Sequence, residues 1–256
     1  LTRDNVIVCL HDAGFPSFPG GELVASLTLQ ELREKAKILD ATREIATLED
    51  FLTELAKSQH PSLAVDLKDT DLIDEYVRLF EAKGVDDRIC VTSWSTSALL
   101  DMHERKPDLP LSFSHISFTG HPIWLRTLLR FLSPIFYVSN GLARWTRVRV
   151  LFNRENSQTP TWARRGCNEV HILTRSPKGR VLEAIRRSGG GIGVFTWCVN
   201  RRSLRKWRAE KLEVRAFSVK TTLDLDRFVQ TGFPDVIFSD SPALVSRQAC
   251  SEEKGG

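Results

Sequence analysis

The chain has 256 residues, of which 41% are hydrophobic and 27% are charged, an ordinary balance for a globular protein with a sizeable core. No run of about eighteen uncharged apolar residues occurs, so the sequence predicts no membrane-spanning helix. The five cysteines are widely spaced, which favours free thiols in a reducing compartment over disulfides or a zinc site. We therefore expect an intracellular protein, either cytoplasmic or peripherally associated with a membrane.

The net charge of +4 conceals an uneven distribution along the chain. Residues 1–119 carry 12 basic and 21 acidic side chains, a balance of −9, whereas residues 120–256 carry 24 and 11, a balance of +13. The basic half suits an anionic partner such as a phosphate group or an acidic membrane surface. A solvated surface without a partner is the alternative.

The chain opens on a turn at residues 3–5 and an apolar run at residues 6–10, which is rich in β-branched side chains and predicts a buried strand. His11 and Asp12 follow the run and precede a loop with two prolines. At such a junction the backbone of the histidine is fixed by the strand while its imidazole is accessible to solvent, which suits proton transfer. The alternative is a histidine that caps the strand and has no chemical role.

Beyond this opening, helix and strand patterns alternate. Thr28 and Thr47 stand at the N-cap positions of two predicted helices, and Glu31 and Asp50 follow them by three residues, as in a capping box. The alternation predicts right-handed crossovers and a parallel sheet. The predicted helices cover residues 28–40, 47–57, 71–83, 96–105, 179–188 and 223–231, and the predicted strands cover residues 63–68, 88–94, 109–114, 168–174, 193–200 and 235–240.

Two stretches interrupt the alternation. Residues 115–167 contain an apolar segment with Arg126 and Arg130, which predicts a helix that either packs on the rest of the protein or lies on a membrane surface. Residues 201–222 carry eight basic and two acidic side chains and predict a disordered loop. The apolar face of the first segment would comprise Trp124, Leu125, Leu128, Leu129, Leu132 and Ile135.

An ordered series of short motifs resembles the glycerophosphodiester phosphodiesterase family. The series consists of Thr2-x-Asp4, His11-Asp12, Gly20-Gly21-x-Leu-Val24, Thr28-Leu-x-Glu31-Leu32, Ile45-x-Thr47-Leu48-Glu49-x-Phe51-Leu52, Leu63-Ala-Val-Asp66-Leu-Lys68, Phe195-Thr-Trp197-Cys-Val-Asn200 and Asp235-Val-Ile-Phe-Ser-Asp240-x-Pro242. No single piece is specific, and the resemblance depends on their order and spacing. Residues 115–167 and 201–222 look like inserts relative to the family pattern.

The resemblance implies an α/β fold, a TIM-type (β/α)8 barrel with its catalytic groups at the carboxyl ends of the strands. The family pattern opens with a His-Arg-Gly strand and a Glu-x-Asp strand, and neither motif occurs in this sequence. We therefore expect a barrel domain over residues 1–245 that is incomplete at its N-terminus, with those strands upstream of Leu1, and a disordered tail over residues 246–256. On this expectation, residues 1–256 alone are inactive.

The resemblance also assigns the candidate site. His11 corresponds to a catalytic histidine that acts as a general acid or base, and Asp12 would orient its ring. Asp66 stands where the family has a glutamate that ligates a metal, and Lys68, two residues along the strand and so on the same face, would lie near the phosphate. Because aspartate is one methylene shorter, Asp66 would hold the cation directly or through a water. An ion pair at a strand end is the alternative.

Two further residues belong to the family's Trp-Thr-Val-Asn strand. The resemblance places Trp197 in the wall of the substrate pocket and assigns Asn200 to the loop after the strand, both as substrate-binding residues. A core aromatic side chain and a turn asparagine are the alternative.

The resemblance implies a phosphoric diester hydrolase that converts glycerophosphodiesters to sn-glycerol 3-phosphate and an alcohol, with a divalent cation, Ca²⁺ or Mg²⁺, as cofactor. Two alternatives stay open: hydrolysis of lysophospholipids, as in the membrane-associated lysophospholipase D branch, and an inactive barrel that serves as a binding module. The expected partners are a small phosphodiester or a lysophospholipid, with a membrane surface as a further candidate. Residues 201–222 lack the interleaved aromatic side chains of a nucleic-acid groove, so no nucleic acid is expected.

Overall fold

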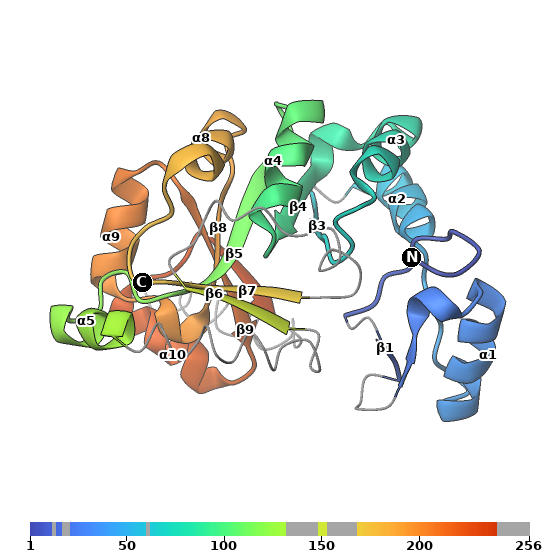
Figure 1. Cartoon of the computed structure of the whole chain (residues 1–256), viewed down its shortest axis with the longest axis horizontal. Helices are drawn as coiled ribbons and strands as arrows, with labels where there is room; N and C mark the ends of the chain where they lie inside the picture. The colour runs from blue at the N-terminus through green and yellow to red at the C-terminus, as the bar shows by residue number, and fades with distance from the viewer. Residues whose placement is uncertain (12–13, 17–20, 60–61, 132–147, 153–167, 240–256) are drawn as a thin grey trace.

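Parallel strands form the centre of the molecule (Figure 1). The structure is a computed structural model, and it describes residues 1–11, 14–16, 21–59, 62–131, 148–152 and 168–239. The parallel strands are β3 (Leu63–Asp66), β4 (Ile89–Ser93), β5 (Leu111–Ser117), β6 (Val148–Phe152), β7 (Asn168–Leu173), β8 (Gly191–Phe195), β9 (Glu213–Val219) and β10 (Val236–Ser239). Two short strands, β1 (Gly14–Phe15) and β2 (Glu22–Leu23), form a separate antiparallel pair. The parallel sheet has the strand order β10-β9-β8-β5-β4-β3, and β7 pairs with the end of β5 and with β6. The expected α/β fold with a parallel sheet is confirmed.

Helices connect the strands, and their caps follow the local sequence. The helices are α1 (Leu29–Leu39), α2 (Leu48–Lys57), α3 (Ile73–Lys83), α4 (Thr96–Arg105), α5 (Ile123–Phe131), α8 (Gly179–Arg187), α9 (Arg201–Ala209) and α10 (Thr222–Thr231), with short 3-10 turns η1 (Val24–Ser26), η2 (Asp86–Arg88) and η3 (Thr196–Cys198). The two predicted capping boxes are confirmed, because Thr28 and Thr47 accept from the N–H groups of Glu31 and Asp50 and those carboxylates accept in return.

One face of the sheet is covered by helices and holds the main hydrophobic core. The core side chains from the strands include Val91, Phe113, Ile192, Val194, Val214 and Ala216, and those from the helices include Leu99, Met102, Ile185, Leu204 and Trp207. All of them are buried. Burial of this much apolar surface is the main stabilising contribution to the fold.

The opposite face of the sheet, called the inner face below, is polar. Asp66 pairs in register with Thr92, and the Thr92 hydroxyl lies 3.0 Å from that of Ser114. Ser114 pairs in turn with Gly193, and Gly193 pairs with Arg215. Since register partners on parallel strands point to the same side, these five residues share the inner face.

The inner face is strongly curved. Arg215 of β9 contacts the sulfur of Cys90 on β4, although β8 and β5 lie between these strands. In a flat sheet, three strand spacings would separate the two strands by about 14 Å, which is beyond the reach of an arginine side chain. Glycines leave room for the curl, because a Cβ at Gly191 would lie only 2.1 Å from the Glu213 carbonyl oxygen. The sheet therefore forms a half-barrel, consistent with the expected barrel architecture.

The prediction of a buried strand at residues 6–10 was wrong. This run forms one antiparallel bridge, between Val8 and Thr47, in which the Cys9 N–H donates to the Ala46 carbonyl and the Leu48 N–H donates to the Ile7 carbonyl. It thus lies between two clusters: Ile7 packs on the main core, whereas Val8 and Leu10 pack on a small separate core. The run pairs with the segment before α2 and not with a strand of the parallel sheet. The small core consists of Phe15, Val24, Leu27, Leu32, Ala36 and Ile45.

The prediction of a disordered loop at residues 201–222 was also wrong. This stretch forms α9 and β9, and β9 is an internal strand between β8 and β10. The basic side chains occupy the outer side of α9, while Leu204 and Trp207 are buried. The preceding strand is shorter than expected, because it ends at Phe195 and continues as the 3-10 turn η3.

Several expectations fall outside the described residues. These are Asp12, Leu132, Ile135, Asp240, Pro242 and the tail at residues 246–256. Within the described ranges, no helix is long and apolar enough to cross a membrane. Of the cysteines in those ranges, Cys9, Cys90 and Cys198 are free thiols.

Candidate active site

Asp66 and Lys68 lie where β3 ends. The strand alternates, since Leu63 and Val65 pack on the main core and Asp66 is exposed on the inner face. The Lys68 ammonium lies 2.7 Å from the Asp66 carboxylate. The predicted common face is therefore confirmed by a direct contact, and the two groups form an ion pair in this structure.

A cation site at this position would begin with Asp66. Among the residues that the structure describes, no group of three or more histidine, cysteine, aspartate or glutamate side chains is placed to hold a metal ion. Ca²⁺ takes roughly six to eight oxygen ligands, whereas Mg²⁺ is often held by one or two carboxylates together with phosphate oxygens and waters. A cation held by Asp66 would therefore need further oxygen ligands, from the substrate phosphate and from water.

The opening run lies beside the carboxyl end of β3. The backbone nitrogen of Leu1 is 3.9 Å from the carboxylate of Asp69, in the loop that follows β3. Burial raises the pKa of Tyr76 in α3, and the nearby groups of Asp69, Cys9 and Asp66 raise it further. One phenol is thus within electrostatic range of both the opening run and the end of β3.

His11 is exposed and lies in a bend two residues beyond Cys9. Leu10, between them, packs on the small core, whereas Cys9 and His11 are both exposed. This arrangement brings the backbone that carries His11 to the edge of the sheet that carries Asp66. A direct approach of the imidazole to that carboxylate stays a prediction.

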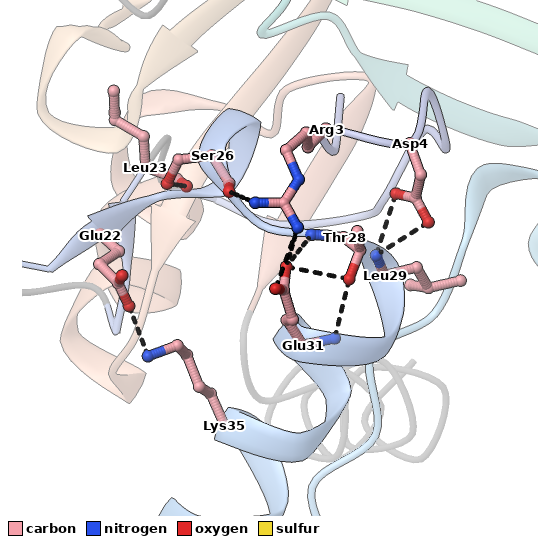
Figure 2. A network of polar contacts seen from close by, with 9 residues as sticks. All are labelled: Arg3, Asp4, Glu22, Leu23, Ser26, Thr28, Leu29, Glu31 and Lys35. Carbon is pink, nitrogen blue, oxygen red and sulfur yellow. Dashed lines mark hydrogen bonds and ion pairs between the residues drawn. The ribbon is translucent and has the colours of Figure 1, made fainter.

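A polar network holds the start of the opening run to the N-terminus of α1 (Figure 2). Asp4 accepts from the Leu29 N–H at 3.0 Å, and Arg3 donates to both Glu31 oxygens at 3.0 and 2.9 Å. The Thr28 hydrogen bonds hold the pKa of the Glu31 carboxyl below its usual range, as in a capping box. The motif residue Asp4 thus anchors the turn that leads to His11.

Aromatic side chains gather at the carboxyl ends of β4, β8 and β9. The ring centroids of Trp94 and Phe217 are 5.7 Å apart, those of Trp94 and Phe195 are 6.0 Å apart, and those of Phe195 and Phe217 are 4.4 Å apart. Trp197 stacks on Phe195 and contacts Phe118, and it is 40% exposed. The rings lie at the same end of the strands as Asp66, the end at which (β/α) barrels carry their sites.

Charged side chains lie one layer below these rings. Arg215 is buried, donates to Glu213 at 3.0 and 3.1 Å, and contacts Cys90. Burial raises the pKa of the Cys90 thiol, while the charge of Arg215 opposes the shift. Arg215 and Phe217 were not predicted as site residues, because their strand was expected to be a loop. The signal was present, since Glu213, Arg215 and Phe217 alternate with the apolar Val214 and Ala216.

Asn200 is a helix cap. Its Oδ1 accepts from the N–H groups of Arg202 and Ser203 at 3.1 and 3.0 Å, so it fixes the turn between η3 and α9. This agrees with the expected role in holding the loop, and a contact with substrate stays a prediction. Trp197 lies in η3, just after the end of β8, and not on the strand itself. Phe217 lies near the end of β9, which pairs with β8 and β10.

Comparison with known proteins points to one fold. No protein-family model and no curated protein matches this sequence. A Silicibacter pomeroyi structure, provisionally named a glycerophosphoryl diester phosphodiesterase, matches with a TM-score of 0.64 at 16% identity, over 99% of this chain and 81% of its own. A glycerophosphodiester phosphodiesterase from Parabacteroides distasonis matches with a TM-score of 0.59 at 15% identity, over 99% and 82%.

A third structure adds a ligand. An Oleispira antarctica phosphodiesterase in complex with the product sn-glycerol-3-phosphate matches with a TM-score of 0.61 at 16% identity, over 98% of this chain and 82% of its own. At these identities the likeness shows a shared fold. It agrees with the architecture implied by the motif series.

Proposed function

We propose that the protein containing this chain hydrolyses glycerophosphodiesters to sn-glycerol 3-phosphate and an alcohol. The observation that carries the proposal is the shared fold with solved phosphodiesterases, one of which holds that product. The ordered motifs support it independently of the fold. Asp66 and Lys68 at the carboxyl end of β3, beside the run that leads to His11, supply side chains suited to this chemistry.

In this proposal, His11 moves the proton. As a base, its imidazole takes the proton of the hydroxyl adjacent to the phosphoester, and that oxygen attacks phosphorus. As an acid, it gives a proton to the departing alkoxide as the P–O bond breaks. The product of the first step is a cyclic phosphate, which water then opens. The exposed position of His11 at the end of an anchored run suits both roles.

Asp66 and Lys68 bind the charged parts of the substrate complex. When bound, Mg²⁺ would neutralise phosphate charge, and Asp66 would be one of its ligands. For this to happen the Asp66–Lys68 ion pair must open, since one carboxylate cannot serve both cations fully. We propose that Lys68 then turns to the phosphate, where its ammonium binds a non-bridging oxygen.

Hydrolysis of glycerophosphocholine by the natural protein tests the proposal. We expect His11→Ala to lower kcat by about 100-fold or more, because positioned proton transfer contributes that much. His103→Ala, which changes a histidine of α4 that matches no motif, serves as the matched control and should retain wild-type activity. Wild-type kcat in His11→Ala would remove His11 from the mechanism.

Two other functions are distinguished by the same assay. Exposed apolar side chains near the aromatic rings favour a lysophospholipid as substrate, and preference for lysophosphatidylcholine over glycerophosphocholine would support that choice. The closed Asp66–Lys68 pair is the observation that favours an inactive barrel acting as a binding module. That function would be supported if the natural protein binds sn-glycerol 3-phosphate and cleaves neither diester.

A further inference from the structure

Helix α5 turns an apolar face to solvent. Four of its side chains, Ile123, Trp124, Leu128 and Phe131, are between 47% and 78% exposed. On a helix of 3.6 residues per turn they fall on one side together with Thr127, so this side carries no charge. Leu125 and Leu129 lie on the other side and are half-buried. The expected helix exists, and much of its apolar face does not pack on the protein.

The exposed face continues toward the candidate site. Residues just before α5 are anchored there, since the ring of Phe118 contacts Trp197 at 5.6 Å and also contacts His121. On α10, Arg227 donates to the Trp197 carbonyl oxygen at 3.0 Å, and Leu223, one helical turn earlier, is exposed. Trp197 stands at the end of β8, beside the rings described above. Figure 1 shows α5, α9 and α10 at the same end of the molecule.

The surroundings of this face are basic. The stretch of residues 118–131 contains two arginines and no acidic residue, and residues 197–208 contain five basic residues and no acidic one. Arg202, Arg205 and Lys206 of α9 are exposed. An uncharged apolar face with cations close by is complementary to a bilayer of anionic lipids, which accepts apolar side chains between its headgroups and attracts the cations.

We propose that the rim surface, defined as Ile123, Trp124, Leu128, Phe131 and Trp197, docks on an anionic phospholipid bilayer. In that orientation, the aromatic cluster at the strand ends would face lipids. Docking is independent of catalysis. Docking would also favour a diester that carries an acyl chain as substrate, and this consequence rests on the proposed function.

Vesicle flotation of the 256-residue chain tests the docking. With vesicles of phosphatidylcholine and phosphatidylserine, we expect the double variant Trp124→Ser/Phe131→Ser to lower the partition coefficient by about ten-fold or more, since each change removes a large apolar side chain. The matched control is Ile38→Ser/Phe51→Ser. Ile38 of α1 is 82% exposed and Phe51 of α2 is also exposed, and both helices lie at the opposite end of the molecule from α5 (Figure 1). The control should bind like the wild-type chain.

Charge provides a second readout. Binding should weaken when phosphatidylserine is omitted or when salt is raised, and Arg202→Glu/Arg205→Glu should weaken it without changing the apolar face. Equal flotation of the wild-type chain and the Trp124→Ser/Phe131→Ser variant would overturn the proposal. A second result would also overturn it: the wild-type chain does not bind vesicles, and sedimentation velocity shows a dimer that dissociates in the variant. The apolar face would then be the contact between two copies of the chain.

Turnover separates the docking from the proposed function. In the natural protein, Trp124→Ser/Phe131→Ser should leave glycerophosphocholine hydrolysis unchanged and lower hydrolysis of lysophosphatidylcholine presented in vesicles. If neither substrate is cleaved but flotation behaves as expected, the proposed function fails and the docking surface stands. If wild type and variant cleave each substrate at equal rates and bind vesicles equally, the docking proposal is wrong and the proposed function stands.

Discussion

At the scale of single residues, His115 of β5 is completely buried in the helix-covered core. Its ring stacks on Phe113 with 5.0 Å between centroids, and its Nδ1 lies 3.1 Å from the Phe113 carbonyl oxygen. Burial lowers the pKa of His115 to about 3; the Phe113 carbonyl opposes this shift and His171 adds to it. The ring therefore stays neutral well below pH 6.5, where an exposed histidine takes up a proton.

This burial makes stability depend on pH. The unfolded chain regains a histidine pKa near 6.5, so only the unfolded state binds this proton between about pH 6.5 and 3. The contribution to stability is complete above pH 6.5 and is lost as pH falls toward 3. Between pH 6.5 and 4.5, we expect the free energy of unfolding in urea to fall more steeply for wild type than for His115→Gln, by up to about 1.4 kcal/mol per pH unit.

A core variant elsewhere is the control for this comparison. Leu99→Ala lowers stability but keeps His115, so its pH slope should equal that of wild type. Parallel slopes for wild type and His115→Gln would show that the buried imidazole does not account for acid sensitivity. Cys198, like His115, is a buried group that stays uncharged in the core, since burial raises the pKa of its thiol to about 12.

At the scale of elements, the turns between strands and helices position the site. Gly120, before α5, has a φ of +83°, and a Cβ there would lie 2.6 Å from the Ser203 nitrogen and 2.8 Å from Asn200 Oδ1. This close approach packs the start of the α5 segment onto the N-terminus of α9. The position thus requires glycine for both its backbone conformation and its lack of a side chain.

We expect Gly120→Ala to destabilise the protein more than Gly84→Ala does. Gly84 also has a positive φ, +60°, but no atom lies within 4 Å of the place that a methyl group would take there, so that change costs only the backbone conformation, roughly 1–2 kcal/mol. At Gly120 the steric clash adds about 1–3 kcal/mol. Urea unfolding of both variants gives the difference, and equal losses would mean that the contact with α9 relaxes without cost.

The capping box of α1 supports the opening run. Thr28→Ala removes the hydroxyl that accepts from the Glu31 N–H at 3.2 Å, and we expect a loss of about 1 kcal/mol in the free energy of unfolding. Because Glu31 also binds Arg3, amide hydrogen exchange at residues 2–6 should accelerate along with exchange in the first turn of α1. Faster exchange in α1 alone would show that the opening turn does not depend on the cap.

At the scale of the whole molecule, the Asp66–Lys68 ion pair lies on the inner face of the half-barrel, at the carboxyl end of β3. If Asp66 and Lys68 serve the cation and the phosphate respectively, their ion pair competes with ligand binding. Lys68→Met in the natural protein should therefore strengthen stabilisation by Mg²⁺ alone and weaken stabilisation by sn-glycerol 3-phosphate, because it frees the carboxylate and removes the ammonium.

Thermal unfolding with each ligand measures both effects, since a ligand at about 100 times its Kd adds roughly 2.7 kcal/mol to the folded state. Asp66→Asn is the complementary variant and should remove the shift with Mg²⁺. Identical Mg²⁺ shifts for wild type, Lys68→Met and Asp66→Asn would place the cation elsewhere.

Much of the local structure could be predicted from the sequence. The capping boxes at Thr28 and Thr47, the alternating helices and strands, and the common face of Asp66 and Lys68 depend on residues a few positions apart. The motif series pointed to a fold that solved phosphodiesterases share. The opening run misled the strand prediction, because the same apolar pattern suits any chain segment buried between two clusters.

The sequence by itself thus determined the capped starts of α1 and α2 and, outside residues 6–10 and 201–222, most of the alternation of helices and strands, since caps, turns and periodicity act over short distances. Only the tertiary structure decided that Arg215 of β9 meets Cys90 of β4 across a curled sheet, and that α5 turns Trp124 and Phe131 outward. A helix or strand pattern shows which side chains share a face. Segments far away in the chain decide whether that face packs on the protein or stays exposed to solvent.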